Sequence, residues 1–505
     1  MSLNLAEVFF QKAATQPDHP LILGPRDGSC ISYGEFQRGV QIMAERLRTA
    51  GIGKGMNIGL HYPSDQNYIT FTYALWVVGA SVTPIPMELA NEEKQQILQL
   101  IAIDALISSV RFCDVFEPFV VSEASELNEQ ARLLKVKTQR QAPPELAAIN
   151  PAFIRFTSGT TGSAKGVVLS HETILERINA ANQGLHIGPE DCIVWLLSMA
   201  YHFTVSIVAY LSFGATIVLP KNAFGVSLLR AAIDHKATMI YGAPTHYELM
   251  THDRSDKSLP QLRFAIVTTA RLSTDLAEAF YQRFGLALNE TYGIIEIGLP
   301  AINIEQPREK QGSVGQLLPA YFIKLVRQPG QNTGEILLNG PGLLDAYYEP
   351  WQGREEILEK HNGWLATGDL AVMDDAGFLT IVGRSKEMIS VAGMKFFPQE
   401  VEKVLERHPY IQAACVFGIK VSRLGESPIA HLVLNEGCNA PDENALNDHC
   451  AKVLASYKIP SQFQWVACLA RTASGKLIRN ADKLLNTDKP TTNVGEQHDR
   501  TTSAT

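Results

Sequence analysis

One stretch of the sequence gathers the residue types that bind phosphate. It runs from Phe156 to His171, reads FTSGTTGSAKGVVLSH, and places glycines and hydroxyl residues ahead of one lysine, Lys165. Glycines let successive backbone amides turn toward one anion, hydroxyl groups add donors, and a lysine adds a positive charge. These residues predict a phosphate cradle, and the alternative is a flexible linker that happens to contain a lysine.

Two other kinds of site do not fit this stretch. A Walker A loop needs glycine directly before the lysine, and Ala164 stands there. The nucleophilic serine of a hydrolase sits in a Gly-x-Ser-x-Gly turn, and neither Ser158 nor Ser163 does. The predicted role is therefore the binding of a phosphate.

Strands and helices alternate around this loop and must position it. Strand-like AFIRF precedes the loop, and a helix is expected from about Glu172. Ser32 and Glu35 form a capping box ahead of a helical pattern, and strand-like MIYGAP and FAIVTT each precede a helix farther along the chain. This alternation predicts an α/β fold with parallel sheets covered on both faces, in which ligands bind at the carboxyl ends of the strands.

The sequence pattern changes near Gly383. Shorter strand and helix patterns beyond it predict a small α+β domain. We therefore expect a large N-terminal domain over residues 1–383 and a C-terminal domain over residues 384–485. Residues 486–505 are polar and nearly devoid of large apolar side chains, so we expect a disordered tail.

The composition excludes several classes of protein. The chain has 505 residues, of which 46% are hydrophobic and 19% charged, and this is typical of a soluble globular protein with more than one domain. Its 44 basic and 52 acidic residues give a net charge of −8, which offers no footprint for nucleic acid or an anionic membrane. Seven scattered cysteines without a C-x-x-C spacing argue against a disulfide framework and a zinc site, so we expect a cytoplasmic protein.

One segment raises the question of membrane insertion. Cys192 to Pro220 carries no formally charged residue and is long enough to cross a bilayer. It also contains His202, Thr204 and other polar residues, and it splits into short strand-like runs. We predict a buried strand, helix and strand of a soluble core instead. The N-terminal residues lack the pattern of a signal peptide, and we expect no stable membrane insertion.

Five motifs in order resemble those of the adenylate-forming superfamily, which contains acyl-CoA and aryl-CoA synthetases, stand-alone adenylation domains and luciferases. TSGTTGSAKG resembles its phosphate loop. The other four are NETYGIIE at Asn289–Glu296, GWLATGDL at Gly363–Leu370, GRSKEMISVAGMKFFPQEVE at Gly383–Glu402, and RTASGKLIR at Arg471–Arg479. The resemblance implies a large N-terminal AMP-binding domain of stacked α/β sheets and a small mobile α+β domain, joined at a hinge beside Arg384 and Lys386.

The resemblance also implies a reaction in which a carboxylate attacks the α-phosphate of ATP, pyrophosphate leaves and an acyl adenylate forms. Lys476 would bridge the carboxylate and the α-phosphate, and Glu296 would help to ligate Mg²⁺. Tyr292 would lie against adenine, while Asp369 and Arg384 would hold the ribose hydroxyls. The β- and γ-phosphates would be held by Thr157, Ser158, Gly159, Thr160, Thr161, Gly162 and Lys165, of which Thr157 and Lys165 count with Lys476 and Glu296 as catalytic.

Each of these residues also has an ordinary structural interpretation. Asp369 could be an ordinary turn residue, Glu296 an ordinary surface carboxylate, and Lys476 a solvated lysine without a role in catalysis. In the second half-reaction that the resemblance implies, a pantetheine thiol attacks the adenylate after the small domain rotates. Gly393 would then border the thiol tunnel, and its alternative is an ordinary tight turn.

Three positions depart from the family pattern. Ile295 replaces a threonine thought to touch the α-phosphate, so other donors must bind this phosphate and adenylation is expected to be slow or altered. Thr268 and Thr269 precede Ala270 where the family often has Gly-Gly-Ala. Their added groups should narrow the acid pocket and favour a small or flat acid, or one with a polar group. Ala470 replaces a common proline with little expected effect.

The acid pocket is expected to exclude α-amino acids. Amino-acid-activating relatives carry an aspartate after a phenylalanine, whereas Thr204 follows here, so the ammonium of an amino acid would be buried without a counter-ion. His202 resembles the histidine that gates or lines the pocket, and taken alone it fits a core histidine. The predicted pocket residues are His202, Thr204, Thr269, Ala270 and Gly293, with a further wall from Gly242 to Glu248.

The sequence thus predicts an acid–thiol ligase that uses ATP, Mg²⁺ and CoA and acts on an aryl or acyl carboxylic acid without an amino group. One alternative is a stand-alone enzyme that loads the phosphopantetheine of an acyl carrier protein. A luciferase-like oxygenase and a relative that binds nucleotide without catalysis are the others. Retention of Lys165, Glu296, Asp369 and Lys476 argues against the last.

Overall fold

The computed structural model describes residues 3–24, 29–122, 125–138, 140–156, 165–392, 394–421, 425–472, 475–479, 481 and 484. The chain divides into two compact units. The first comprises Met1–Lys386 with the short segment Ala473–Lys476, and the second comprises Glu387–Thr472 and Leu477–Thr505. The loop that carries Lys476 therefore groups with the first unit.

The first nine-stranded sheet of the first unit has a parallel centre and antiparallel edges. Its strands are β1 (Pro20–Leu23), β2 (Cys30–Ser32), β10 (Cys192–Trp195), β11 (Thr216–Val218), β12 (Met239–Gly242), β13 (Phe264–Val267), β14 (Asn289–Ile294), β15 (Gly298–Ile302) and β16 (Gln316–Leu317). The order is β16-β15-β14-β13-β12-β10-β11-β1-β2, and pairing is parallel from β14 through to β1. The pairs β14–β15, β15–β16 and β1–β2 are antiparallel.

The second nine-stranded sheet is built in the same way. Its strands are β3 (Asn57–His61), β4 (Ser81–Pro84), β5 (Ala105–Ser109), β6 (Ser125–Asn128), β7 (Ala131–Lys135), β8 (Pro151–Phe156), β9 (Gly166–Ser170), β19 (Ala346–Tyr347) and β20 (Gln352–Gly353). The order is β20-β19-β9-β8-β4-β3-β5-β7-β6, with β8, β4, β3 and β5 parallel. The phosphate-loop motif connects β8 to the antiparallel strand β9.

Helices cover both sheets because successive strand residues point to opposite faces. The helices of this unit are α1 (Leu5–Thr15), α2 (Tyr33–Thr49), α3 (Gln66–Val77), α4 (Asn91–Leu100), α5 (His171–Leu185), α6 (Met199–His202), α7 (Ile207–Phe213), α8 (Gly225–Asp234), α9 (Pro244–Thr251), α10 (Thr274–Phe284) and α11 (Arg354–Glu359). The main core joins α1, α2, α3, α5 and α7 to one face of each sheet. In β10, Ile193 belongs to this core and Val194 to the core under α8, α9 and α10.

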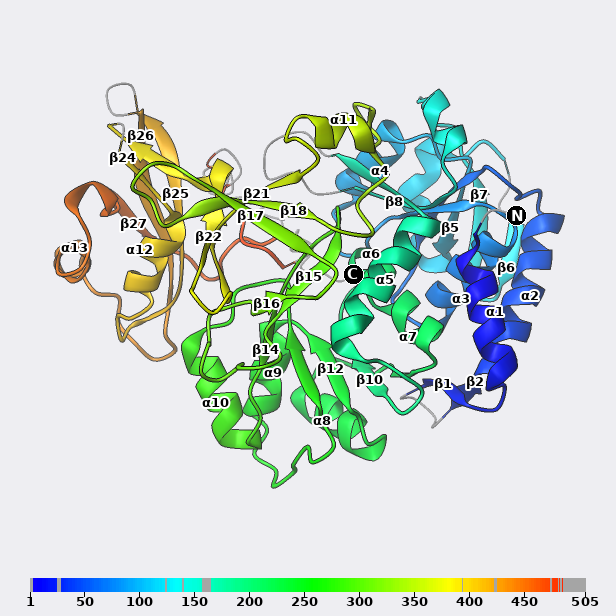
Figure 1. Cartoon of the computed structure of the whole chain (residues 1–505), viewed down its shortest axis with the longest axis horizontal. Helices are drawn as coiled ribbons and strands as arrows, with labels where there is room; N and C mark the ends of the chain where they lie inside the picture. Colours follow the sequence, from blue (N-terminus) through cyan, green and yellow to red (C-terminus); the bar gives the residue numbers. More distant parts are fainter. Residues whose placement is uncertain are drawn as a thin grey trace, which may run out of the picture. The chain divides into compact units, whose positions relative to one another are not determined.

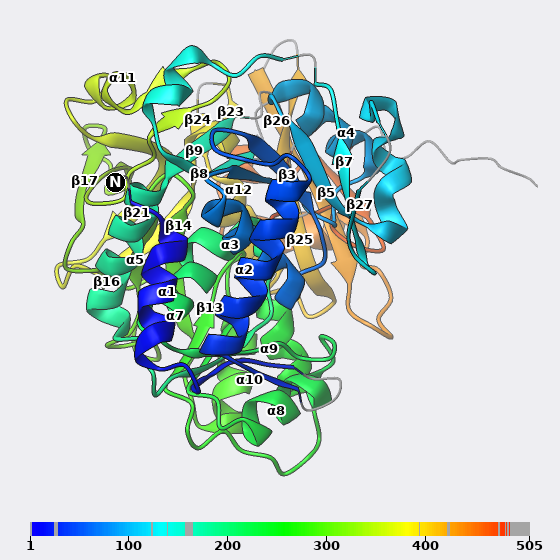
Figure 2. The same ribbon diagram turned by 90° about the vertical axis from the view of Figure 1, so that its right-hand side faces the viewer.

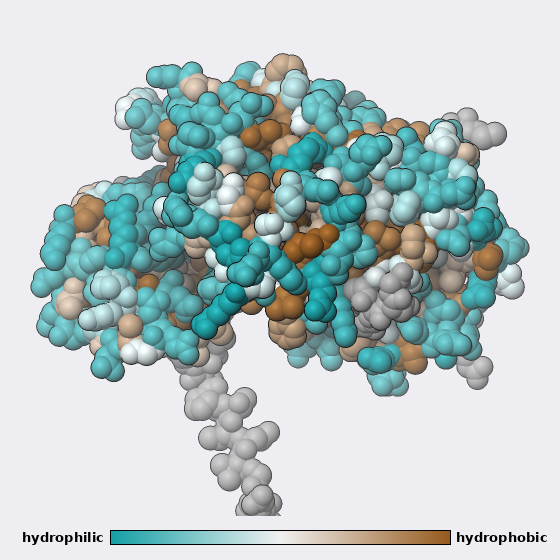
Figure 3. Space-filling view, turned by 90° about the horizontal axis from the view of Figure 1, so that it is seen from below, coloured by the Kyte–Doolittle hydropathy of each residue, from teal (hydrophilic) through white to brown (hydrophobic). Residues whose placement is uncertain are grey.

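The figures show these layers. Figures 1 and 2 show α8, α9 and α10 together beside β12, β13 and β14. On the second sheet, a separate core packs α4 and the 3-10 helix η1 (Val110–Phe119) on the opposite face from the main core. On the face of the molecule in Figure 3, hydrophobic residues lie in small groups among hydrophilic ones. The predicted α/β architecture with sheets covered on both faces is confirmed.

The uncharged segment that is long enough to cross a bilayer folds as helices and strands of the core, as predicted. Cys192–Pro220 contains β10, α6, the 3-10 helix η3 (Phe203–Val205), α7 and β11, and most of its residues are buried. Gly214 ends α7 with φ of 92°, a conformation that favours glycine. Over the described ranges, no helix has the length and hydropathy needed to cross a bilayer.

A third sheet in the first unit was not predicted. It is antiparallel, with the order β17-β18-β21-β22, and it carries two of the predicted site residues. Its strands are β17 (Phe322–Arg327), β18 (Gly334–Asn339), β21 (Leu365–Met373) and β22 (Leu379–Arg384). The alternation of strands and helices that predicts parallel sheets does not extend to these strands, which pair as the two hairpin-like pairs β17–β18 and β21–β22.

The second unit is the small α+β domain that the sequence predicts. A five-stranded sheet is formed by β23 (Ile389–Val391), β24 (Met394–Phe396), β25 (Ile411–Val421), β26 (Gly425–Leu434) and β27 (Gln462–Trp465). Its core also includes residues of α12 (Pro398–Leu405) and α13 (Glu443–Ala451). Arg479 forms ion pairs with Glu402 at 2.9 Å and Glu387 at 3.2 Å, so it ties the segment after the lysine loop to α12. The predicted tail, residues 486–505, lies outside the described residues.

Candidate active site

The ends of the phosphate loop are held together by strand pairing. Phe156, the last residue of β8, faces Gly166, the first residue of β9, and Lys165 directly precedes β9. A Cβ atom at Gly166 would lie 2.9 Å from both the Phe156 ring and Tyr348, so glycine is needed at this close approach. The loop residues Thr157, Ser158, Gly159, Thr160, Thr161 and Gly162 lie outside the described residues.

Lys165 and Glu296 share a neighbour, Tyr347. The Lys165 Nζ lies 4.3 Å from the centroid of the Tyr347 ring, and the Tyr347 hydroxyl donates a hydrogen bond of 3.4 Å to Glu296 Oε1. Burial and, second, the negative charge of Glu296 raise the pKa of Tyr347, so its hydroxyl stays a donor. The predicted phosphate lysine and the predicted Mg²⁺ ligand are therefore brought together by a residue that the motifs did not indicate.

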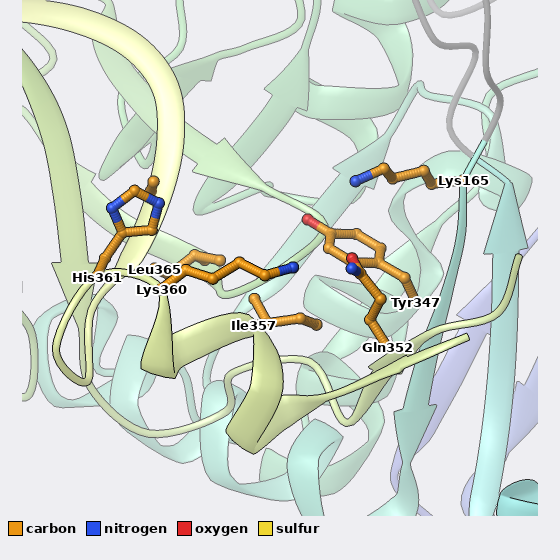
Figure 4. A pocket seen from close by; sticks show the side chains of 8 residues that line it. Lys165, Tyr347, Gln352, Ile357, Lys360, His361 and Leu365 are labelled. Atoms are coloured by element: carbon orange, nitrogen blue, oxygen red, sulfur yellow. The ribbon is translucent and has the colours of Figure 1, made fainter. Parts of the chain in front are cut away.

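Lys165 also borders an open pocket, shown in Figure 4. In this view the amino groups of Lys165 and Lys360 both point toward Tyr347. Two ammonium groups at one pocket suit a polyphosphate. The lining residues are Lys165, Tyr347, Gln352, Ile357, Lys360, His361, Leu365 and Ala366.

The backbone around Glu296 is held by a buried arginine. Arg177 on α5 is 1% exposed; its Nη1 donates to the carbonyl oxygen of Ile295 at 3.0 Å, and its Nε and Nη2 donate to that of Gly342. The amide of Leu344 donates to the carbonyl oxygen of Glu296 at 2.7 Å. These contacts fix the β14–β15 connection, so Arg177 is a positioning residue that the sequence did not reveal.

Packing accounts for two other residues at or beside this connection. Ile295 is 8% exposed and belongs to the main core. Gly293, predicted to border the acid pocket, is exposed in the hairpin. A Cβ atom there would lie 2.7 Å from the carbonyl oxygen of Gly298, so close approach of the two strands requires glycine.

Asp369 accepts hydrogen bonds on both carboxylate oxygens. The Tyr292 hydroxyl donates to Oδ2 at 2.7 Å, and Arg384 Nε pairs with Oδ1 at 2.8 Å. Asp369 and Arg384 face each other across β21 and β22, and Gly368 adopts φ of 71° just before the aspartate. Tyr292 is 7% exposed, and its burial is the main reason why its pKa is raised. The negative charge of Asp369 is the second reason. The Thr-Gly-Asp and Gly-Arg-Ser-Lys motifs thus meet at one carboxylate.

Lys476 joins this group of charges. It follows Gly475, which has φ of 86°, and both belong to the first unit. Loss of hydration and, second, the positive charge of Arg384 lower the pKa of Lys476, while Asp369 and Glu296 oppose the shift. The lysine side chain keeps access to solvent.

One predicted acid-pocket residue, His202, belongs to an aromatic cluster. His202, Trp195 and Tyr241 have ring centroids 5.4 to 6.2 Å apart. Burial and, after it, the charges of Arg155 and Lys476 lower the pKa of His202 to about 3, so its imidazole is neutral. Thr204 is 2% exposed and carries no charge. It therefore offers no counter-ion for a buried ammonium.

Thr269 is strained. It follows β13 with φ of 73°, a conformation that a β-branched residue rarely adopts, and Ala270 follows it half-buried. Tyr241 is hydrogen-bonded to the neighbouring Thr268 side chain. A Cβ atom at Gly475 would lie 4.0 Å from Thr269 Oγ1, so Thr269 lies close to the lysine loop.

The hinge residues are only partly described. Lys386 is exposed in the 3-10 helix η4 (Ser385–Glu387), and the division between the units falls after it. Gly393 lies outside the described residues. Like Tyr347 and Arg177, Arg155 in β8 was missed by the motif analysis. A charged residue in an otherwise apolar strand is nevertheless a readable signal.

Comparison with known families decides the relationship. Residues 9–348 match the family model for AMP-binding enzymes, and residues 400–476 match the model for the C-terminal domain of AMP-binding enzymes. The chain belongs to the AMP-binding, adenylate-forming family. The superfamily predicted from the motifs is confirmed.

Relatives of this AMP-binding enzyme are similar over almost their whole length. Sulfoacetate–CoA ligase of Cupriavidus necator is 28% identical, covering 96% of this chain and 97% of the relative. Crotonobetaine/carnitine–CoA ligase of Shigella flexneri is 29% identical, covering 94% and 96%. The solved o-succinylbenzoate CoA synthetase of Bacillus subtilis with its acyl-adenylate intermediate has a TM-score of 0.80 and 25% identity, covering 94% and 97%. The predicted two-domain fold is confirmed.

Proposed function

We propose that the protein is an AMP-forming acid–CoA ligase. The observation that supports this most directly is that Lys476 lies within the electrostatic reach of Asp369, Arg384 and Glu296 in the first unit. Three relatives that match over nearly the whole chain, those named for sulfoacetate, 2-succinylbenzoate and crotonobetaine/carnitine, are CoA ligases, which supports CoA rather than a carrier protein as the acceptor.

The first half-reaction needs positioning and charge neutralisation. A carboxylate of the acid attacks the α-phosphorus of ATP, the bond to the bridging oxygen breaks, and pyrophosphate leaves. We assign to Lys476 the task of holding the attacking carboxylate beside the α-phosphate. Since Ile295 has no hydrogen-bond donor in its side chain, the α-phosphate depends on Lys476 more than in a relative with threonine at this position.

The nucleotide would be held at both ends. Residues 157–162 and Lys165 would bind the β- and γ-phosphates. Lys360, the second lysine of the pocket in Figure 4, would lie beside them. Asp369 and Arg384 would bind the ribose hydroxyls, since a carboxylate can accept further hydrogen bonds beside its present ones. The Tyr292 hydroxyl already bonds Asp369, which leaves its ring for contact with adenine.

A single carboxylate is enough for the proposed metal. Among the described residues no group of three His, Cys, Asp or Glu side chains could hold an ion. Mg²⁺ is usually bound through one or two carboxylates together with phosphate oxygens and water. Glu296, near Lys165 through Tyr347, fits this requirement. When bound, Mg²⁺ would neutralise charge on the departing pyrophosphate.

The acid is proposed to lack an amino group and to bind beside the aromatic cluster. Neutral His202, Thr269 and Ala270 supply the pocket side chains, and buried Thr204 supplies no negative charge. In the second half-reaction the CoA thiol would attack the acyl carbon and AMP would leave, with Gly393 beside the thiol. We propose that the second unit reorients about the hinge beside Lys386 between the two steps.

Pyrophosphate release tests the proposal. The enzyme is incubated with ATP and Mg²⁺ across acyl, aryl and doubly charged acids, with hydroxylamine to trap adenylate, and then with CoA. We expect release that requires an acid and falls by about 10²-fold or more in Lys476→Ala, with acyl-CoA formed only when CoA is present. Formation of adenylate without acyl-CoA would contradict the proposal that CoA is the acceptor. Binding of ATP without formation of adenylate would contradict the proposal that the protein is an enzyme.

A further inference from the structure

Arg155 forms no ion pair with any carboxylate in the described part of the chain. It is the penultimate residue of β8, next to the phosphate loop. Its Nη1 donates to the carbonyl oxygen of Tyr201, and its guanidinium carbon lies 5.6 Å from the Tyr201 ring centroid. Its Nε is buried and has no hydrogen-bond partner among the residues that the structure describes. Of the carboxylates in the described ranges, Glu296 alone acts on its charge, and no ion pair joins the two.

A second buried polar group without a partner lies near it. The Tyr68 hydroxyl on α3 is buried and forms no hydrogen bond with a described residue, and the negative charge of Glu88 and, after it, the positive charge of Arg155 act on it. Buried polar groups are nearly always hydrogen-bonded in native proteins, and exceptions mark sites completed by water or a ligand. A guanidinium and a phenol that interact electrostatically, both with unused hydrogen-bonding capacity among the described residues, suit an acceptor that bears negative charge.

The position of this pair relates it to the acid. Arg155 donates a hydrogen bond to the carbonyl oxygen of Tyr201, the residue directly before His202 of the predicted acid pocket, and its charge acts on His202 and on Lys476, the predicted partner of the reacting carboxylate. Arg155 therefore lies within electrostatic range of both ends of the path that the acid would occupy. An arginine in this place would oppose a purely apolar tail, because its buried charge would remain unpaired.

We propose that Arg155 binds a second anionic group, a carboxylate or sulfonate, of the acid that the enzyme activates, with Tyr68 as an additional donor. The inference rests on the proposed ligase function. Arginine suits this task because its planar fork of donors matches the geometry of carboxylate and sulfonate oxygens. The preferred substrate is thus a small acid with two negative charges, one at the reacting carboxylate and one at Arg155.

The test compares acids that differ only in the second charge. Adenylate formation is measured for sulfoacetate, malonate and succinate against propanoate and butanoate, in the wild type and in Arg155→Met. We expect the wild type to prefer the doubly charged acids, and Arg155→Met to lose about 10²-fold in kcat/KM for them. Activity with singly charged acids should change by less than about threefold, and KM for ATP should stay the same.

Two controls separate this role from others. Arg38→Met removes an exposed arginine from α2 and should leave the acid preference unchanged. Arg155→Lys keeps the charge but not the fork, so it should recover only part of the preference. Thermal unfolding of each variant shows whether a loss of activity follows a loss of folding.

Other outcomes would overturn the inference. Equal losses with all acids together with a higher KM for ATP would assign Arg155 to the phosphates. A wild-type preference for singly charged acids would also contradict it. If no acid is adenylated, the proposed ligase function fails. Calorimetric titration of the same diacids into the wild type and into Arg155→Met then tests the anion site by itself. The inference stands only if the wild type binds the diacids and Arg155→Met does not.

Discussion

The hydroxyl group of Tyr292 donates a hydrogen bond of 2.7 Å to the carboxylate of Asp369, and both side chains are buried. The bond joins a residue of the first nine-stranded sheet to one of the antiparallel sheet. It keeps one oxygen of Asp369 in a defined direction while Arg384 holds the other. The proposed ribose site is therefore preorganised by protein contacts before the nucleotide binds.

Tyr292→Phe should weaken nucleotide binding without removing the aromatic ring. A hydrogen bond to a charged group contributes about 1.5–3 kcal/mol, so KM for ATP should rise by about 10- to 100-fold. The matched control is Tyr73→Phe, because the Tyr73 hydroxyl is buried without a hydrogen-bond partner among the described residues. Steady-state kinetics at varied ATP provides the measurement. An unchanged KM for ATP would show that Asp369 does not depend on Tyr292.

Arg177→Met should destabilise the first unit and reduce adenylation together. The change leaves the buried carbonyl oxygens of Ile295 and Gly342 without their donors, at about 1–3 kcal/mol for each group. Urea unfolding measures the loss, and Arg177→Lys should recover part of it. At a temperature where the variant stays folded, kcat should still fall, because the connection that carries Glu296 is no longer fixed. Normal kcat in the folded variant would limit Arg177 to a structural role.

These residues show which parts of the site the sequence can predict. Asp369, Arg384 and Tyr292 were found because each lies in a short motif whose neighbours, such as Gly368, impose the local backbone. Arg177 was missed because its contacts join residues 118 and 165 positions away, and no local pattern encodes such an approach. The antiparallel sheet was missed for a similar reason, since β18 pairs with β21 across an intervening helix and two short strands.

Thr269→Gly should relieve backbone strain and widen the acid pocket. Thr269 holds φ of 73°, and a strained residue of this kind costs about 1–3 kcal/mol. Glycine adopts this conformation freely but adds entropy to the unfolded chain, so the net gain in the free energy of unfolding should be about 1 kcal/mol. Adenylation should extend to bulkier acids. Thr268→Ala, which leaves the strained backbone in place and removes the hydroxyl bonded to buried Tyr241, should instead lower the free energy of unfolding by about 1 kcal/mol.

Failure of Thr269→Gly would have a clear meaning. A loss of stability would show that the Thr269 side chain contributes more through packing than its backbone costs. An unchanged range of acids, measured as kcat/KM for benzoate against propanoate, would place the threonine outside the acid-binding wall. The second result would remove the proposed link between Thr269 and substrate size.

Glu290 should make the first unit less stable as the pH rises. It is 7% exposed, accepts a hydrogen bond of 2.6 Å from the amide of Gly312, and its burial raises its pKa from 4.5 to about 7. Since the folded-state pKa lies above that of the unfolded chain, the protonated form is favoured by folding. Its contribution is fully present below about pH 4.5 and is lost as the pH rises through about 7.

Glu290→Gln should remove this dependence, because glutamine stays neutral and its carbonyl oxygen can still accept from Gly312. The free energy of unfolding of the variant relative to the wild type should increase by up to about 3 kcal/mol between about pH 5 and about pH 8. Urea unfolding across this range measures the difference. Glu129→Gln, at an exposed position, is the control and should show a flat difference. A flat difference for Glu290→Gln as well would mean that the carboxylate is ionised in the folded protein at acidic pH, with the Gly312 amide and the nearby charge of Arg271 outweighing the effect of burial.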